Sequence, residues 1–380
     1  MSRLVVWIVG FLAFLNLYPM QAVLPLLMTE FGADALQAGA AVGATVLAIA
    51  LLSPLVGVCS DAVGRRGLIN AALFALAVLT FAISLSDSLD GVVLMRFLQG
   101  MAIPGVTVVL TAYLADEFEG AEVSRLMTAY ISGGVFGGFS GRFVAGYMSD
   151  FFGWRAAFII LGSLTLIGAL HVWRRLPPSQ RFVARRDVAG ILRQFRRHVA
   201  NRQLLLVCLI GFCILFSLVG GLTYLMLFLS KAPFSLSPRD LGNVFLVYLI
   251  GALVTPLTAG AMTRLGLRAV LLFALAGAAA GLLLTFVPEL PLIVLGLTLF
   301  SSGIFVAQTV AIRRVAEVVS EGRSLAAGIY GTCYYAGGAV GTWLCGLAYV
   351  RAGWQGSGTV VLVTLALASA AGIMAWRQQH

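Results

Sequence analysis

Residues 203–229 have the sequence QLLLVCLIGFCILFSLVGGLTYLMLFL, which contains no charged side chain. A helix needs about 20 apolar residues to cross the hydrocarbon core of a bilayer, so this stretch predicts a membrane-spanning helix. The whole chain contains twelve such stretches, at residues 4–27, 36–57, 68–85, 91–114, 123–148, 155–173, 203–229, 239–262, 269–287, 291–312, 325–349 and 358–376. Because 60% of the 380 residues are hydrophobic and 11% are charged, the sequence predicts an all-α polytopic membrane protein.

The basic residues are distributed unevenly over the two sides of the predicted spans. Two of the 25 lie inside spans, 19 share a side with both termini, and four lie on the opposite side, at Arg155, Lys231, Arg239 and Arg351. Lys and Arg accumulate in cytoplasmic loops, which predicts that both termini are cytoplasmic. The net charge of +10 therefore reflects membrane topology, and nucleic acid is not an expected partner.

Two stretches of the chain repeat each other. Residues 130–154 align with 330–354 without gaps, and seven positions are identical: Tyr130/Tyr330, Gly137/Gly337, Gly138/Gly338, Gly141/Gly341, Gly146/Gly346, Gly153/Gly353 and Trp154/Trp354. An internal repeat with an even number of spans in each half places both halves in the membrane with the same orientation. The sequence thus predicts two pseudo-symmetric six-helix bundles, residues 1–173 and 203–380.

The segment between the halves, residues 174–202, carries nine arginines and one acidic residue, Asp187. Its apolar residues fall on one helical face, at Val188, Ile191, Leu192, Phe195 and Val199. Two interpretations remain open. The segment is an amphipathic helix on the anionic inner leaflet, or it is a solvated basic linker that only fixes the topology.

Polar residues in the spans mark candidate functional positions. In the fourth span Arg96 and Gln99 share a helical stripe with Gly100, Thr107 and Thr111, and in the fifth span Arg142 lies among glycines. Because a charge in lipid costs several kcal/mol, both arginines should face the protein interior, although Arg96 could also snorkel to the membrane surface. No acidic residue lies well inside any span, so two buried cations suggest that the solute is an anion. Alternatively, Glu30, Asp34 or Asp150 are structural partners of the two arginines.

Further candidates for contact with a solute come from spans that alternate with nearly apolar ones. They are Asn16, Tyr18, Gln21, Tyr224, Ser301, Ser302, Gln308, Tyr330, Tyr334 and Tyr335. Each of them could instead form a hydrogen bond between helices. The third, sixth, ninth and twelfth spans contain few polar residues, and we expect those helices to face lipid.

Between the second and third spans, residues 57–66 read GVCSDAVGRR, which resembles the G-x-L-A-D-R-x-G-R-R signature of the major facilitator superfamily. By that resemblance Gly57, Asp61, Gly64, Arg65 and Arg66 form a cytoplasmic latch between bundles that open and close. Position 62 is alanine, where the family has a basic residue. The resemblance implies a twelve-helix fold that transports a solute by alternating access.

Two further stretches are similar to motifs of that family. Residues 96–100, RFLQG, resemble its fourth-span R-x-x-Q-G motif, which is associated with proton coupling. Residues 137–146 resemble the fifth-span motif of the drug:proton antiporters, with Arg142 in place of a proline. The resemblance implies a transporter in the bacterial cytoplasmic membrane that exports a small organic solute while protons enter. Uptake or exchange of an organic anion without protons, and a receptor that does not transport, remain alternatives.

The sequence favours no enzyme. The three histidines lie far apart, and the five cysteines show no metal-ligand spacing, so neither a metal nor a cofactor is expected. A channel would need a filter sequence, and none is recognisable. The expected partners are a small organic solute, protons and the anionic lipids beside the linker, and the chain is expected to be a monomer.

Overall fold

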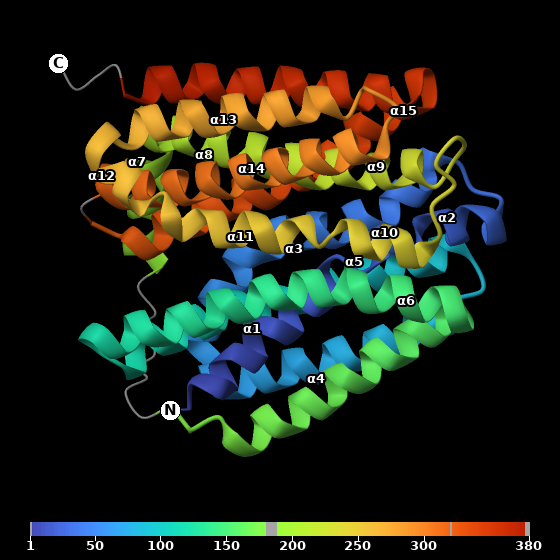
Figure 1. Cartoon of the computed structure of the whole chain (residues 1–380). Helices are drawn as coiled ribbons and strands as arrows, with labels where there is room; N and C mark the ends of the chain where they lie inside the picture. Colours follow the sequence, from blue (N-terminus) through green and yellow to red (C-terminus); the bar gives the residue numbers. More distant parts are fainter. Residues whose placement is uncertain (1, 180–187, 320, 377–380) are drawn as a thin grey trace. The chain divides into compact units, whose positions relative to one another are not determined.

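The computed structural model describes residues 2–179, 188–319 and 321–376, without the side chains of 58, 59, 61–63 and 188–192. Within these ranges the backbone is helical apart from short connections and contains no strand (Figure 1). Helices dominate because, in lipid, only internal hydrogen bonding can satisfy the backbone of a single spanning segment. The all-α fold class predicted from the sequence is confirmed.

The first half of the chain contains α1 (Arg3–Leu17), α2 (Met20–Phe31), α3 (Ala35–Val63), α4 (Arg65–Ser84), α5 (Leu89–Glu117) and α6 (Gly120–Arg175). After the linker helix α7 (Val188–Val199), the second half contains α8 (Arg202–Leu215), a π-helical turn (Phe216–Gly220), α9 (Gly221–Leu229), α10 (Pro238–Val244), α11 (Val247–Leu257), α12 (Ala259–Leu265), α13 (Leu267–Leu284), α14 (Leu290–Val318) and α15 (Arg323–Ala375).

The described residues contain ten helical segments that are long and apolar enough to cross a membrane. Two of them, α6 with 56 residues and α15 with 53, are more than twice as long as one span requires. Each is kinked at a glycine with positive φ, 82° at Gly153 and 59° at Gly353, a conformation that side chains disfavour. Since each kinked helix accounts for two predicted spans, the described chain accommodates all twelve.

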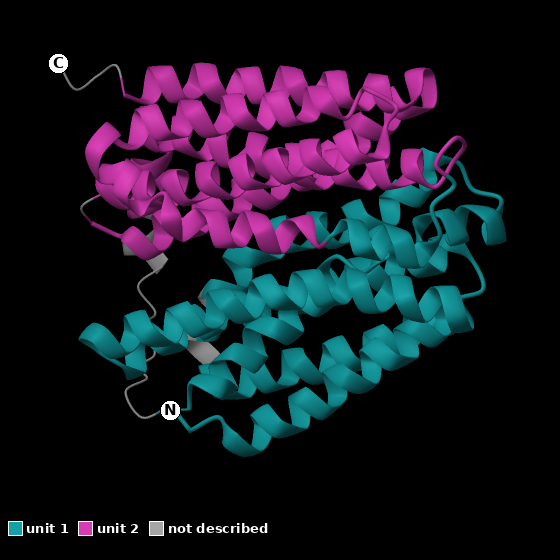
Figure 2. Ribbon diagram, in the orientation of Figure 1, with its two compact units in different colours: residues 1–186, 235–245 teal, residues 187–234, 246–380 magenta. Residues whose placement is uncertain are grey.

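The chain divides into two compact units, shown in Figure 2. Unit 1 comprises residues 1–186 and 235–245, and unit 2 comprises residues 187–234 and 246–380. The short helix α10 groups with unit 1 because it packs on α6: the Pro238 carbonyl oxygen occupies the space that a side chain at Gly146 would need, and Tyr147 donates a hydrogen bond to Asn243 (2.9 Å).

The sequence repeat corresponds to the same packing arrangement inside each unit. In unit 1, side chains at Gly133, Gly137 and Gly141 of α6 would overlap the backbone carbonyls of Trp7, Phe11 and Leu15 in α1. In unit 2, side chains at Gly337 and Gly341 of α15 would overlap the carbonyls of Phe212 and Phe216. Small residues thus let two backbones touch, as in many membrane helix pairs. The sequence places Gly134, Gly138, Arg142 and Gly146 on one helical stripe, and the contact with α1 runs one residue before that stripe.

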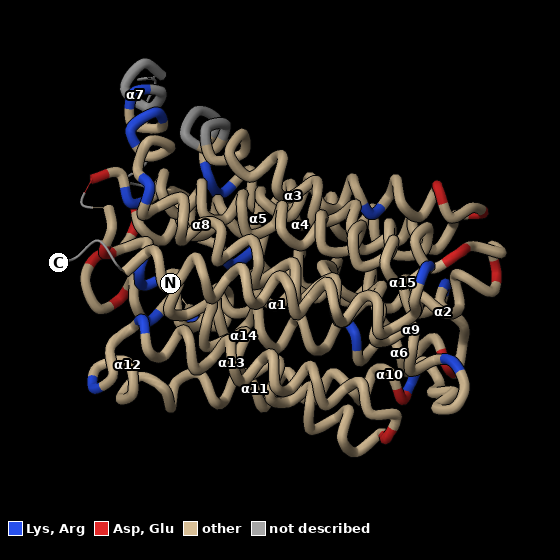
Figure 3. Tube along the Cα trace, turned by 90° about the horizontal axis from the view of Figure 1, so that it is seen from above, with Lys and Arg blue, Asp and Glu red and all other residues tan. Residues whose placement is uncertain are grey.

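Charged and apolar side chains are distributed as a bilayer requires. Figure 3 shows most Lys, Arg, Asp and Glu towards the helix ends, with a few basic positions in the otherwise uncharged stretches between them. Along those stretches large apolar side chains are exposed, for example Leu253 (72%), Phe273 (71%) and Ile167 (65%). Patches of this extent on a soluble protein would cause association, so the exposed apolar surface is the part that lipid covers.

Candidate functional site

The first predicted span is interrupted within unit 1 between α1 and α2. Pro19 has no amide hydrogen and cannot continue the hydrogen-bond ladder of α1, so the helix ends at Leu17 and leaves its last carbonyls without helical donors. The guanidinium of Arg96, from α5, takes up two of them. It donates to the carbonyl oxygens of Asn16 (2.7 Å) and Leu17 (2.5 Å).

Arg96 is fully buried and has two further partners. Its Nε donates to the Ala41 carbonyl of α3 (3.2 Å), and its Nη1 donates to Gln99 Oε1 (2.6 Å). The side chain therefore points into the protein and does not snorkel to the membrane surface. In this conformation it joins α1, α3 and α5, and these four acceptors are all neutral oxygens. Whether it also contacts the solute stays a prediction.

A chain of buried side chains continues from Gln99. Gln99 Nε2 donates to Thr80 Oγ1 (2.7 Å), Thr80 donates to Asn16 Oδ1 (2.7 Å), and Asn16 Nδ2 donates to Thr165 Oγ1 (3.0 Å). Thr80 belongs to α4 and Thr165 to the second half of α6, the third and sixth spans that were expected to be nearly apolar. Both threonines are fully buried, so these spans also contribute to the polar interior.

Arg142 of α6 occupies a different environment in the same unit. Its Nε donates to Gln21 Oε1 (2.8 Å) and its Nη1 donates to the Gly138 carbonyl (2.8 Å). The guanidinium carbon lies 4.4 Å from the centre of the Tyr18 ring and 4.7 Å from that of Phe245. Arg142 is 1% exposed. A cation, an amide and two aromatic faces thus meet at one position, and the sequence did not suggest Phe245.

The candidates in unit 2 fall into two places. Tyr330 donates to Gln308 Oε1 (2.7 Å) and stacks on Tyr334 with 6.2 Å between ring centres, and Tyr335 packs edge-on to Tyr334. Tyr224 donates to the carbonyl of Thr342 (2.7 Å). Thr342 lies twelve residues beyond Tyr330 on α15, so the second place is roughly 18 Å from the first along the helix. Ser301 is fully buried and Ser302 half-buried. Among the described residues Ser301 Oγ has no hydrogen-bond partner.

The two arginines of the predicted latch contact other residues of unit 1. Arg65 Nη2 pairs with Asp116 at the end of α5 (2.7 Å), and Arg66 Nη2 donates to the Trp173 carbonyl near the end of α6 (3.3 Å). Gly64, between α3 and α4, has a φ of 97°. Gly57 is half-buried in α3, and the side chain of Asp61 lies outside the described residues. A latch between the units therefore remains a prediction.

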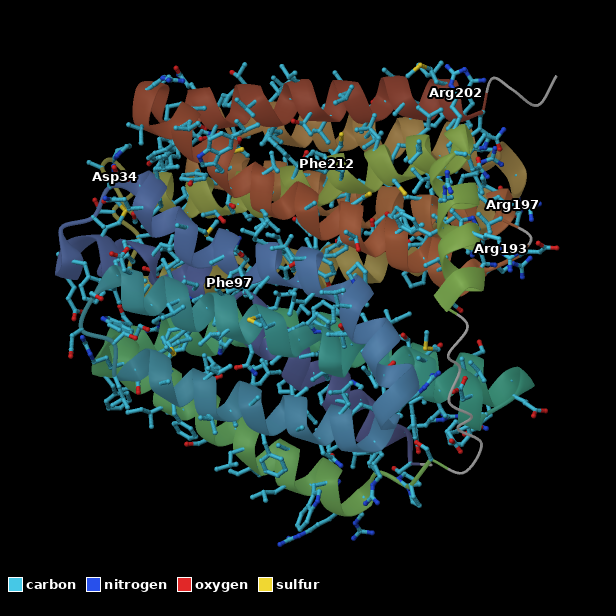
Figure 4. All side chains as sticks on the ribbon, turned by 180° about the vertical axis from the view of Figure 1, so that it is seen from behind. Asp34, Phe97, Arg193, Arg197, Arg202 and Phe212 are labelled. Atoms are coloured by element: carbon cyan, nitrogen blue, oxygen red, sulfur yellow. The ribbon has the colours of Figure 1, made fainter. Side chains whose placement is uncertain are left out.

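Export in exchange for protons would need a proton carrier, for which Glu30, Asp34, Asp61 or the solute itself are candidates, and Glu30 and Asp34 both have partners within unit 1. Glu30 accepts a hydrogen bond from the Trp154 indole and forms an ion pair with Arg155. Asp34, at one end of unit 1 in Figure 4, caps α3 by accepting from the Gln37 amide (2.8 Å). This hydrogen bond satisfies one of the backbone donors that a helix N-terminus leaves without a helical acceptor.

The linker contains α7, whose Phe195 and Val199 are exposed alongside Arg193, Arg196 and Arg197. Arg197 pairs with Glu321 at 3.0 Å, an exposed contact worth little. Figure 4 shows Arg193 and Arg197 on α7 and Arg202 at the start of α8, all at one end of unit 2, with Phe212 further along α8. Binding of this segment to the anionic leaflet stays a prediction, and Val188, Ile191 and Leu192 have no described side chains.

Comparison with known proteins identifies the family. The model of the Major Facilitator Superfamily matches residues 6–235 and 221–379. The chain belongs to the major facilitator superfamily. The resemblance inferred from residues 57–66 is thereby confirmed, and with it a multi-pass membrane transporter of a small solute rather than an enzyme.

Relatives within the superfamily cover nearly the whole chain. The inner membrane transport protein YnfM of Escherichia coli (strain K12) is 32% identical over 375 residues, 98% of this chain and 89% of its own length. An uncharacterized transporter of Buchnera aphidicola subsp. Schizaphis graminum (strain Sg) is 29% identical over 360 residues, 94% and 87% of the two chains. The crystal structure of a bacterial homologue of the human lysosomal transporter Spinster, inward-facing and occupied, superposes with a TM-score of 0.80 at 16% identity, covering 99% and 96%.

Proposed function

We propose that this superfamily member exports a small organic acid by alternating access, in exchange for protons. The observation that carries the proposal is the environment of Arg142. A guanidinium recognises a carboxylate with paired, charge-assisted hydrogen bonds, and Gln21 can add an amide donor. The faces of Tyr18 and Phe245 offer an apolar surface for the body of the solute.

The candidate residues of unit 2 support an organic solute rather than an inorganic ion. Gln308 and the hydroxyl of Tyr330 provide hydrogen bonding, and Tyr334 and Tyr335 provide aromatic surface. Such a combination of a few polar groups with aromatic side chains is typical of sites that bind organic molecules. We propose that Arg96 and Gln99 act indirectly, by fixing the break between α1 and α2 close to Tyr18.

The direction of transport and the coupling to protons rest on the similarity to the antiporter motifs. Residues 96–100 and 137–146 support export with inward proton flow. Because Glu30 and Asp34 already have structural partners, the proton is carried by Asp61 or by the carboxylate of the solute itself. The distribution of Lys and Arg supports cytoplasmic termini, and the similarity to YnfM supports the bacterial inner membrane.

A second candidate function is uptake or exchange of an organic anion without protons. It is favoured by the ion pair between Glu30 and Arg155 and by the capping role of Asp34. Although burial raises it, the pKa of Glu30 is held below its usual value by the hydrogen bond from Trp154 and by Arg155, which makes this carboxylate a poor carrier of protons at neutral pH.

Transport measured in proteoliposomes tests the proposal. With a panel of radiolabelled aromatic and aliphatic acids and of lipophilic cations, we expect saturable flux of acids. Arg142→Ala should lower kcat/KM for the transported acid roughly 10- to 100-fold, the equivalent of one charge-assisted contact, and Arg142→Lys should be partly active. Arg351→Ala, which removes an exposed arginine, is the control and should transport as the wild type does.

The same vesicles separate the two candidate functions. An inward proton gradient should accelerate export if protons are exchanged. If the flux does not depend on the gradient, coupling to protons is wrong, and transport of an organic anion without protons is supported. If folded Arg142→Ala carries every transported acid at the wild-type rate, recognition of the solute by Arg142 is wrong.

A further inference from the structure

A cavity lies at one end of unit 2, and none of the candidate residues described above lines it. It is open to the surface, has a volume of about 380 Å³, which is within the range of ligand sites, and is lined by residues of α12, α13 and α14 and by Trp376 after α15. Its walls include two arginines, one glutamate, one tryptophan and two large apolar side chains: Arg268, Arg314, Glu317, Trp376, Met262 and Leu267. Two cations against one carboxylate give these walls a net positive charge.

The inner wall of this cavity contains a buried guanidinium. Arg314 is 3% exposed, pairs with Glu317 at 3.1 Å and donates to the Ala375 carbonyl at 3.2 Å. Its guanidinium carbon lies 4.7 Å from the centre of the Trp376 ring. Among the described residues its Nε has no hydrogen-bond partner. A buried donor without an acceptor costs about 1–3 kcal/mol, so Arg314 is held here without all of its donors satisfied.

At the equivalent position unit 1 makes a similar contact without an arginine. Helices α5 and α14 both have 29 residues, and the repeat pairs Tyr113 with Arg314 and Asp116 with Glu317. Tyr113 forms the corresponding hydrogen bond near the end of α6: its neutral hydroxyl donates to the Pro177 carbonyl (3.1 Å). A phenol therefore suffices for that structural role. In unit 2 the arginine adds a positive charge and an unused donor.

We propose that this cavity binds the phosphodiester headgroup of an anionic phospholipid. The exposed Arg268 supplies donors for the phosphate, and the buried Arg314 beside the same cavity adds positive charge. Trp376 has the amphipathic indole that is enriched at the membrane–water interface, and Met262 and Leu267 provide apolar contact for the start of the acyl chains. The cavity lies where α13 begins and where α14 and α15 end, which is the depth of the headgroups. Basic pockets between membrane helices bind anionic lipids by this chemistry.

The test compares lipids on the purified full-length protein in detergent. We expect phosphatidylglycerol to raise the apparent Tm and to remain bound in native mass spectrometry, whereas phosphatidylcholine does neither. Arg268→Ala should weaken phosphatidylglycerol binding about tenfold, the loss of one charge-assisted contact. Because Arg268 is exposed and α13 does not depend on it, the Tm without lipid should not change.

Arg264→Ala is the matched control, since Arg264 is an exposed arginine in the last turn of α12 that does not line the cavity. It should bind phosphatidylglycerol as the wild type does. Equal weakening by both variants would show that only general surface charge attracts the lipid, and the proposal would be wrong. Equal stabilisation by inorganic phosphate and by phosphatidylglycerol would show a site for free phosphate, which also contradicts a lipid site.

Discussion

Replacing Arg96 by methionine should destabilise the folded protein by on the order of 3 kcal/mol or more. Methionine is of similar length and apolar, so the change removes the donors without leaving a large cavity. The carbonyl oxygens of Asn16, Leu17 and Ala41 would then be buried without the donor that Arg96 supplies. Each buried acceptor that loses its donor costs about 1–3 kcal/mol, because neither lipid nor a dry interior can replace it.

The measurement is the apparent Tm in detergent, where we expect a fall on the order of 5–10 °C. Arg351→Met is the control, because Arg351 is exposed, and its Tm should match the wild type. If Arg96→Met melts normally but no longer transports, Arg96 acts on the solute or on coupling, and its structural role as described is wrong.

Replacing Gly137 by leucine should strongly reduce the fraction of the protein that folds. Any side chain at this position would overlap the Phe11 carbonyl oxygen, which is backbone and cannot turn away. The insertion would force α6 away from α1 and separate Arg142 from Gln21 and Tyr18. Overpacking in a tight core typically costs 1–3 kcal/mol, and a leucine against backbone should exceed that range.

The yield of monodisperse protein in size-exclusion chromatography should fall at least about tenfold for Gly137→Leu. Gly331→Leu is the matched control. Gly331 belongs to α15, the helix equivalent to α6, but nothing lies within 4 Å of the position of its Cβ. Its yield should be close to the wild type. Similar yields for both variants would contradict the tight contact between α1 and α6.

Much of the architecture could be predicted from local patterns. The length and apolar composition of stretches such as 203–229 identified the spans, since crossing a bilayer is a requirement on each segment separately. Gly137 and Gly337 revealed the repeat, because both must be small for two backbones to touch. Residues 57–66 identified the family. The glycine pattern did not show which glycines touch α1. The structure shows that Gly133, Gly137 and Gly141 form this contact.

The polar interior was predictable only in part. Arg96, Gln99 and Asn16 stood out because polar groups are rare inside spans, but Thr80 and Thr165 did not, although they connect the same network. Phe245 was missed because an aromatic residue in an apolar span carries no distinguishing pattern. Arg314 was missed because its span was expected to end at residue 312, which placed it in a basic loop.

By itself, the sequence determined the class of the molecule: an all-helical transporter of the major facilitator superfamily, built as a repeat. Those properties follow from hydrophobicity, length and short motifs, which are local along the chain. The tertiary structure decided what each buried polar group does. Arg96 binds carbonyls that the break before Pro19 leaves free, and Arg314 replaces a tyrosine of the other half. Such partners are far apart in the sequence, and only the packing of the helices brings them within hydrogen-bond distance.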